Sequence, residues 1–237
     1  ATVSVADDIR TVPSITSVKT SDEDANGQID RLTIVFSEQV DVVDVAGDGF
    51  SEVSVTNPPY TIPNGDYSVT GNTTLVLTLT ESGSSDTGVT PEVAFTNSGD
   101  VTDALTNADA ANQSATESTD GAGPAIVSSR TVTTTTVEVT FSETIEDGTL
   151  TTGDFTFSGF GTGDANAVDT GFSSGTVDDT KVTLTLAAEI GPEETGLVAF
   201  SAAGVIDDLD TEINVSTQSA TVSVADDIRT VPSITSV

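Results

Sequence analysis

The chain of 237 residues contains no cysteine, histidine, methionine or tryptophan, and these absences remove whole classes of function. Without cysteine there is no disulfide and no thiol nucleophile. Without histidine, the commonest general base and the commonest ligand of transition metals are both missing. With no tryptophan and only two tyrosines, the chain has little aromatic surface against which a sugar ring can stack. We therefore expect that this protein is not an enzyme.

Basic residues are also scarce. Six Lys and Arg stand against 38 Asp and Glu, which gives a net charge of -32. Such a surface repels nucleic acid and anionic membranes. Its self-repulsion is relieved either by high salt or by divalent cations, so the composition is typical of a halophilic protein or of a calcium-loaded surface protein. No apolar run approaches the ~20 residues of a membrane span, so no membrane insertion is expected within this segment.

The sequence repeats on two scales. Its first eighteen residues, ATVSVADDIRTVPSITSV, recur unchanged as its last eighteen, and the distance from Ala1 to Ala220 sets a period of 219 residues. Inside this period, TIVFSEQV from Thr33 matches EVTFSETI 105 residues later, and PEVAFTNSGDVTD from Pro91 matches GLVAFSAAGVIDD at the same offset. A constant offset indicates two related domains within each period.

Short acidic segments followed by a proline, at Pro13, Pro124 and Pro232, mark the expected joints between domains. We expect residues 1–12 to be the last strand and linker of a preceding copy. Residues 13–120 and 121–225 are the two expected domains. Residues 226–237 are expected to be the linker and first strand of the next copy.

Val, Ile and Leu alternate with Thr and Ser in short segments bounded by Gly, Asn, Asp and Pro, which predicts strands. About seven strands in roughly a hundred residues is typical of an immunoglobulin-like β-sandwich. We therefore expect an all-β fold of two tandem immunoglobulin-like β-sandwiches. The clearest expected strands are Ser14–Val18, Arg31–Phe36, Glu52–Thr56, Tyr67–Thr70, Thr74–Thr80, Glu92–Thr96, Ser114–Ser118, Ala125–Ser129, Thr136–Phe141, Asp154–Ser158, Lys181–Leu186 and Leu197–Ser201.

The stretch DANGQIDRLTIVFSEQV from Asp24 resembles the opening of Ig-like domains that occur in tandem in large bacterial and archaeal surface proteins. VTDALTN from Val101 resembles their late turn, although the glycine of that turn is missing here. The resemblance covers both domains. It implies an adhesin stalk, a surface layer or an extracellular fibre, and therefore an extracellular or cell-surface location.

The acidic loop, DEDANGQID at Asp22–Asp30, is the main candidate for a calcium site. Calcium binds six to eight oxygen atoms, and a loop with alternating acidic residues and a glycine at its turn can supply several of them. The matching stretch of the second domain, RTVTTTTV, has no carboxylate. The alternative is a solvated hairpin held by Asx turns. The predicted ligands are the side chains of Asp22, Asp24, Asn26 and Asp30 and the carbonyl of Gln28.

A second set of acidic residues lies at the expected joints, which calcium often stiffens in chains of Ig-like domains. The alternative is that these carboxylates face water. The candidates are Asp7, Asp8, Asp120, Asp226 and Asp227 in the linkers and Glu38 and Glu143 in the two FSE motifs, with Asp103 and Asp208 of the late turns nearby.

Two further kinds of site are suggested by short motifs. Asn72, Asn112 and Asn214 each begin an N-x-Ser/Thr sequon, which makes them glycosylation candidates on an exported chain. The segment NPPYTIPNGDY carries both tyrosines, Tyr60 and Tyr67, which are candidates for contacting a ligand.

Two functions fit these observations. The first is a structural repeat unit of an extracellular filament or cell-surface stalk, built from tandem Ig-like domains rigidified by calcium. Its partners are identical copies of itself, in tandem or end to end through exchanged strands. The exact eighteen-residue repeat favours this function, because nearly identical tandem copies suit a fibre better than an enzyme. The alternative is an Ig-like adhesin module that binds a glycan or protein through its loops.

Overall fold

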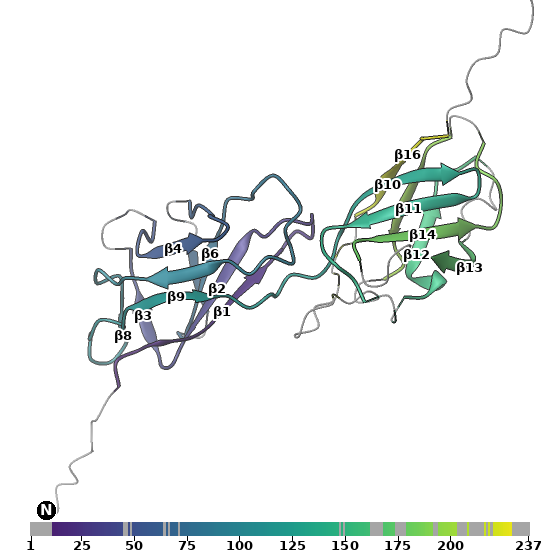
Figure 1. Cartoon of the computed structure of the whole chain (residues 1–237). Coiled ribbons are helices and arrows are strands. Elements are labelled where there is room, and N and C mark those ends of the chain that lie inside the picture. The colour runs from purple at the N-terminus through teal and green to yellow at the C-terminus, as the bar shows by residue number, and fades with distance from the viewer. Residues whose placement is uncertain are drawn as a thin grey trace, which may run out of the picture. The chain divides into compact units, whose positions relative to one another are not determined.

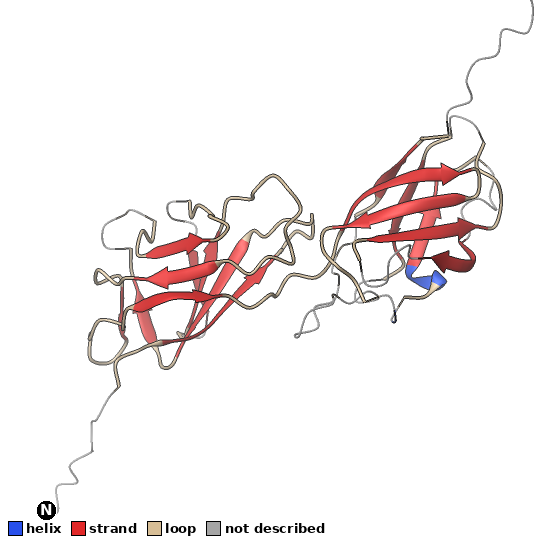
Figure 2. Ribbon diagram, viewed as in Figure 1, coloured by secondary structure: helices blue, strands red, loops and turns tan. Residues whose placement is uncertain are grey.

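The computed structural model confirms an all-β chain with one described 3-10 turn, η2 (Thr152–Asp154) (Figures 1 and 2). Among the described residues no helix is long and apolar enough to cross a membrane. The structure describes residues 11–44, 47, 49–63, 65, 67–70, 72–146, 148, 150–161, 168–173, 179–191, 194–202, 208, 216, 218 and 220–228.

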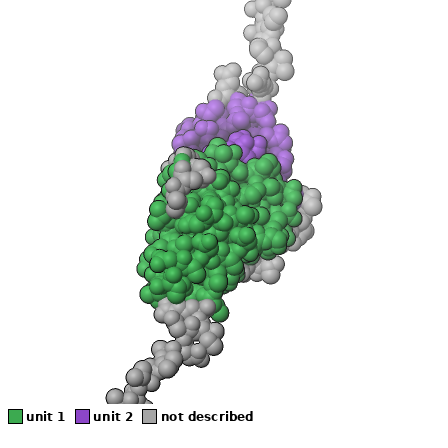
Figure 3. All heavy atoms as spheres, turned by 90° about the vertical axis from the view of Figure 1, so that its left-hand side faces the viewer, with its two compact units in different colours: residues 1–19, 31–80, 90–119 green, residues 20–30, 81–89, 120–237 purple. Residues whose placement is uncertain are grey.

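Contacts between Cα atoms divide the chain into two compact units, which Figure 3 distinguishes by colour. Unit 1 consists of Ala1–Lys19, Arg31–Thr80 and Thr90–Thr119, and unit 2 of Thr20–Asp30, Glu81–Val89 and Asp120–Val237. Two connections that lie between strands of unit 1 in the sequence, residues 20–30 and 81–89, therefore belong to unit 2 by their contacts.

The first nine strands form three antiparallel sheets, with strand orders β1-β2-β6-β5, β4-β7-β9 and β3-β8. The β2–β6 pair has a continuous register from Arg31 opposite Thr78 to Val35 opposite Thr74. The strand bounds are β1 (Ile15–Ser21), β2 (Arg31–Phe36), β3 (Val40–Val42), β4 (Val53–Thr56), β5 (Tyr67–Thr70), β6 (Thr74–Thr78), β7 (Glu92–Phe95), β8 (Val101–Asp103) and β9 (Gln113–Glu117).

The remaining strands form one curled mixed sheet in unit 2, with the order β12-β15-β16-β10-β11-β14-β13 (Figure 1). Its one parallel pair among the described residues is β10 with β16, which places Ser129 opposite Val224. The strand bounds are β10 (Ile126–Thr133), β11 (Thr136–Phe141), β12 (Phe155–Ser158), β13 (Val168–Ser173), β14 (Lys181–Leu186), β15 (Gly196–Phe200) and β16 (Val222–Ala225).

Both units use the same strand order. In unit 2, the strands β12-β15-β16 and the strands β10-β11-β14-β13 form two consecutive parts of one sheet. In unit 1, the corresponding parts are two separate sheets, β4-β7-β9 and β1-β2-β6-β5. A parallel bridge between Lys19 and Thr119 joins the two parts in unit 1, as the β10–β16 pair joins them in unit 2. The internal repeat in the sequence is therefore matched by a repeat in topology.

Alternation along the strands builds the core. The side chains of Val137, Val139 and Phe141 on β11 are buried, while their neighbours on the strand are half-exposed. Phe141 stacks on Phe200 with ring centroids 6.2 Å apart. Because aromatic residues are few, branched aliphatic side chains fill most of this core.

The expected strands agree with the structure to different degrees: β10 extends four residues beyond its expected end, and β13 was not among the expected strands. β2, β11 and β14 have the expected bounds, as does the shorter β5. The three-residue strands β3 and β8 were not anticipated, because three residues are too few to show an alternation. The immunoglobulin-like assignment and the four-segment division stay predictions.

The packing of unit 2 predicts unequal effects for two leucine truncations. Leu184 is fully buried in the core, whereas Leu197 is 37% exposed. Leu184→Ala should lower the free energy of unfolding by about 2–5 kcal/mol, because it leaves a cavity. Leu197→Ala should cost about 1 kcal/mol. Denaturant unfolding of both variants checks this, and equal losses would contradict the assigned core.

Candidate metal centre

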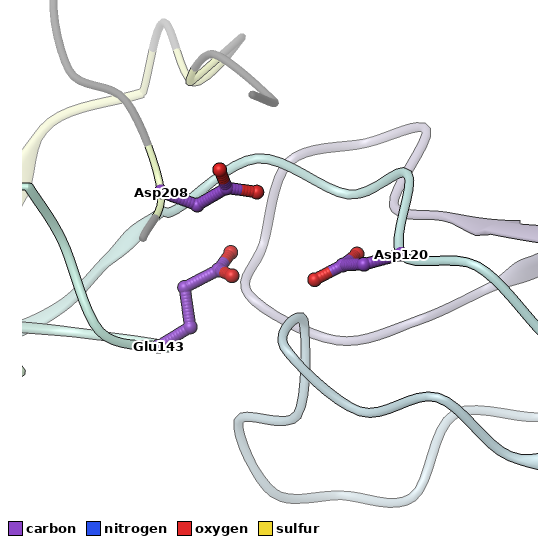
Figure 4. A group of neighbouring side chains, drawn as sticks. All are labelled: Asp120, Glu143 and Asp208. Carbon is purple, nitrogen blue, oxygen red and sulfur yellow. The ribbon is translucent and has the colours of Figure 1, made fainter. Parts of the chain in front are cut away.

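Three buried carboxylates from separate stretches of the chain converge in unit 2. The residues Asp120, Glu143 and Asp208 are 3%, 8% and 2% exposed. One carboxylate oxygen from each lies within 4.8 Å of the other two. Figure 4 shows the three carboxylate groups pointing toward a common centre. We refer to these residues as the acidic triad.

The local backbone positions each member of the triad. Asp120 lies between β9 and β10, and its Oδ1 accepts the N–H of Ala122 at 3.0 Å. Glu143 follows the end of β11. Asp208 is paired with Ile145 in an isolated antiparallel bridge. Because Ile145 is fully buried and lies two residues beyond Glu143, this bridge brings Asp208 and Glu143 to the same place.

The triad has the chemistry of a cation site. Carboxylates this close repel one another unless a proton or a cation neutralises them. Two oxygens bound to one Ca²⁺ at 2.3–2.6 Å can lie as far as ~5 Å apart, which accommodates the observed spacing. The acidic triad can therefore bind a metal ion.

Residues 81–89 pack against the triad. Thr87 Oγ1 and Ser142 Oγ are 2.6 Å apart, which is a hydrogen bond. A β-carbon added to Gly88 would lie 3.1 Å from Cβ of Glu143, closer than side chains ordinarily pack. Glycine at position 88 therefore lets this loop approach the triad.

The acidic loop, Asp22–Asp30, is folded by its own polar side chains. Asp22 accepts the N–H of Gly27 at 2.7 Å and that of Asn26 at 3.3 Å. The Oδ1 of Asn26 accepts the N–H of Gln28 at 2.9 Å. These are the Asx-turn hydrogen bonds that the alternative interpretation of this loop anticipated. They direct several of its oxygens to backbone N–H groups.

Hydrogen bonds also tie the acidic loop to residues 81–89. Asp86 Oδ1 accepts the N–H of Ile29 at 2.7 Å, and the N–H of Asp86 donates to the carbonyl of Gly27 at 3.0 Å. The side-chain amide of Asn26 donates to Glu81 at 2.8 Å. The two loops therefore form one hydrogen-bonded assembly within unit 2.

Gly27 is the residue on which the fit of this assembly depends. Its φ of +94° lies in the left-handed region that glycine favours. A β-carbon there would lie 2.8 Å from Cγ1 of Val127 and 3.2 Å from Cβ of Ser142. A residue with a side chain could not bring the loop this close both to Val127 at the start of β10 and to Ser142, which follows β11.

The structure brings together some of the predicted ligands and separates others. Asp120 and Glu143 meet in the triad, with Asp208 as the third member. Among the described residues, this is the one group of three or more carboxylates that comes so close. Asp24 and Asn26 instead line a hollow of about 430 Å³ that no member of the triad lines. Calcium in the acidic loop stays a prediction.

The other linker candidates have contacts of their own. Glu38 occupies in unit 1 the place that Glu143 has in unit 2, and it accepts a hydrogen bond from Thr11 at 3.3 Å. Asp226 accepts a backbone N–H two residues further on. Asp227 is paired with Arg130 at 3.4 Å.

The tyrosines and the sequons lie in unit 1 where they are described. Tyr60 is 9% exposed, and the ring of Tyr67 packs edge-on against Phe50 with centroids 4.6 Å apart. Both rings thus pack against the interior. Asn72 and Asn112 are exposed, as glycosylation requires. The candidates outside the described residues are Asp7, Asp8 and Asn214.

No family model and no curated protein matches this chain. Among solved structures, the chain is similar to the S-layer protein rSbsC(31-844), with 15% identity and a TM-score of 0.35 over 91% of this chain and 26% of that one. It is also similar to the N-terminal part of the bacterial S-layer protein SbsC, with 13% identity and a TM-score of 0.33 over 91% and 44%. The chain spans less than half the length of either protein.

Burial of Asp22 predicts a pH dependence of stability in metal-free protein. Burial raises the pKa of its carboxyl from 3.8 to about 6, with a smaller contribution from Asp24, against the hydrogen bonds from Gly27 and Asn26. Because the pKa of Asp22 is higher in the folded state than in the unfolded state, the folded state binds more protons between pH 4 and pH 6. Stability from this group therefore rises as the pH falls through 6.

This dependence can be isolated by comparing wild type with Asp22→Asn in chelator between pH 4 and pH 8. Wild type should gain up to about 3 kcal/mol relative to the variant as the pH falls from 8 to 4. Asp41→Asn, a substitution of an exposed aspartate in β3, is the charge-matched control and should show no such change. A constant difference between wild type and Asp22→Asn would contradict the assignment.

Proposed function

We propose that this chain is a structural repeat unit of an extracellular filament or cell-surface stalk, made of tandem Ig-like domains and rigidified by calcium. The observation that carries the proposal is the convergence of Asp120, Glu143 and Asp208 as a buried acidic triad. The proposed partners are further copies of the same chain.

Repetition supports the structural role. An unchanged repeat of eighteen residues at a period of 219 is what a chain of nearly identical copies produces. Repeats that contact chiefly their neighbours extend the length of a protein without requiring a larger core. The matching strand orders of the two units show that the shorter repeat is also a structural one.

Calcium is the cation that best fits the triad. Ca²⁺ prefers oxygen ligands and tolerates varied geometry, whereas Mg²⁺ demands a near-ideal octahedron. Three carboxylates give the site a high negative charge, and backbone carbonyls or water would complete the coordination. Extracellular modules bind Ca²⁺ with dissociation constants of ~10⁻⁴–10⁻³ M. Such a site would be filled outside the cell and empty at cytosolic calcium concentrations.

Asp120 gives the ion its mechanical effect. It directly follows Thr119, the last residue of unit 1 in the sequence, while Glu143 follows β11 and Asp208 bridges to Ile145 in unit 2. An ion held by all three residues would fix the start of the connecting segment to the body of unit 2. Calcium would thereby restrain the start of this segment against the rest of unit 2.

The test is thermal melting with calcium and with chelator. An ion that binds only the native state should stabilise wild type by ~2.7 kcal/mol at a hundredfold excess over Kd. Glu143→Gln removes one charge of the triad with little change of shape. In chelator this variant should melt above wild type, because repulsion is relieved. In calcium it should melt below wild type, because a ligand is lost.

Glu117→Gln is the matched control, since it removes one negative charge from an exposed residue of β9. It should keep the full calcium shift. Wild-type melting that calcium leaves unchanged at low salt would rule out calcium rigidification. An undiminished calcium shift in Glu143→Gln would place the ion elsewhere, with the acidic loop as the next site to test.

A further inference from the structure

The surface of unit 2 around the triad has a counterpart in unit 1. Ser142 donates its N–H to the carbonyl of Ala125 at 2.9 Å and accepts the N–H of Ala125 on its Oγ at 2.9 Å. Ser37 makes the same two hydrogen bonds with Ser14, at 2.8 and 3.1 Å. Each serine follows the phenylalanine that ends its strand and precedes a glutamate.

A second correspondence supports the first. Asp208 lies opposite Ile145 in an antiparallel bridge, and Asp103 lies opposite Val40 in the register of β3 and β8. Asp103 is 2% exposed, as is Asp208. The surface that carries Glu143 and Asp208 in unit 2 is therefore built again in unit 1.

The two counterpart surfaces differ in what covers them. In unit 2, Gly27 and Thr87 pack against Ser142, and Glu143 is buried. In unit 1, Ser37 is exposed and Glu38 is half-exposed. Two exposed apolar residues follow residues that bond to this stretch. Val12, which is 46% exposed, follows Thr11, whose hydroxyl donates to Glu38. Leu105, which is 70% exposed, follows Ala104, whose N–H donates to the carbonyl of Gln39 at 3.1 Å. We call Val12, Ser37, Glu38 and Leu105 the receiving surface.

The loops that cover the unit 2 surface also have a counterpart. The carbonyl of Gly27 accepts the N–H of Asp86, which joins the β1–β2 connection to the β6–β7 connection. In the same way, the carbonyl of Thr134 in the β10–β11 turn accepts the N–H of Ile190, in the β14–β15 connection, at 2.6 Å. Thr134 is thus the counterpart of Gly27.

The hairpin turn of this second assembly is exposed, and it lies beside Asp227. Thr134 is exposed, and Val132 in the same hairpin is 48% exposed. Asp227 donates its N–H to Thr131 Oγ1 at 2.9 Å and pairs with Arg130. The linker that leads toward the next copy therefore starts beside the hairpin.

We infer that the β10–β11 hairpin of one copy docks on the receiving surface of a second copy of this chain. The inference rests on the proposed function, because it requires copies that follow one another. Thr134 would meet Ser37, as Gly27 meets Ser142 within unit 2, and Val132 would cover the exposed apolar side chains of Val12 or Leu105.

The inferred joint differs chemically from the packing seen in unit 2. The β10–β11 turn has no carboxylate, whereas the acidic loop brings four acidic residues and their hydrogen bonds. In the inferred joint, apolar contact between Val132 and the receiving surface would replace the hydrogen bonds that the acidic loop makes in unit 2. Each period of the filament would then contain two kinds of joint, one with an acidic loop and one without.

A two-copy chain, residues 1–219 followed by residues 1–237, tests the docking directly. Because the natural chain lacks cysteine, the first copy can carry Thr134→Cys and the second Ser37→Cys as the sole thiols. A β-carbon on Gly27 would lie 3.2 Å from Cβ of Ser142, near the ~3.5–4.5 Å of a disulfide. Mild oxidation should therefore form an intramolecular disulfide in most molecules, visible as a faster band on a non-reducing gel.

The matched control keeps Thr134→Cys and moves the second thiol to Val69→Cys, on the exposed face of β5. This pair should remain reduced. The inference would be overturned if both chains formed the disulfide equally. It would also be overturned if the Thr134–Ser37 pair formed none while its reduced form melted like wild type. The calcium shift of the single-copy chain, which uses neither position, tests the proposed function separately.

Discussion

Repulsion between carboxylates is the constraint on which this structure depends. A net charge of -32 opposes compaction everywhere, but most of the acidic side chains that the structure describes relieve it by facing water at least in part. Asp120, Glu143 and Asp208 cannot, because they are buried beside one another. Their mutual repulsion disfavours burial, and the same arrangement can bind a metal ion that neutralises it.

The loops around the triad show how the fold accommodates this charge. The side-chain oxygens of Asp22, Asn26 and Asp86 accept hydrogen bonds from backbone N–H groups. These hydrogen bonds order the acidic loop without requiring a bound ion. Within unit 2, Gly27 and Gly88 allow these loops to pack closely against Val127, Ser142 and Glu143. A cation at the triad would act on a surface that hydrogen bonds and packing have already assembled.

Local features were predictable from sequence, and long-range pairings were not. β2 and β11 alternate over six residues, so their bounds could be predicted. Glu143 and Asp208 were found through the 105-residue offset that also relates Glu38 and Asp103. Their convergence with Asp120 depends on the bridge at Ile145, which no local pattern encodes. The hydrogen bond between Ile29 of the acidic loop and Asp86, 57 residues further along the chain, could not be predicted from the sequence either.

The central claim is that one calcium ion joins the three carboxylates of the triad. A crystal structure determined from crystals grown in calcium, with an anomalous difference map, tests it most directly. The account predicts a peak between Asp120, Glu143 and Asp208, about 2.3–2.6 Å from an oxygen of each. An ordered triad without a peak, or calcium bound only in the acidic loop, would contradict it.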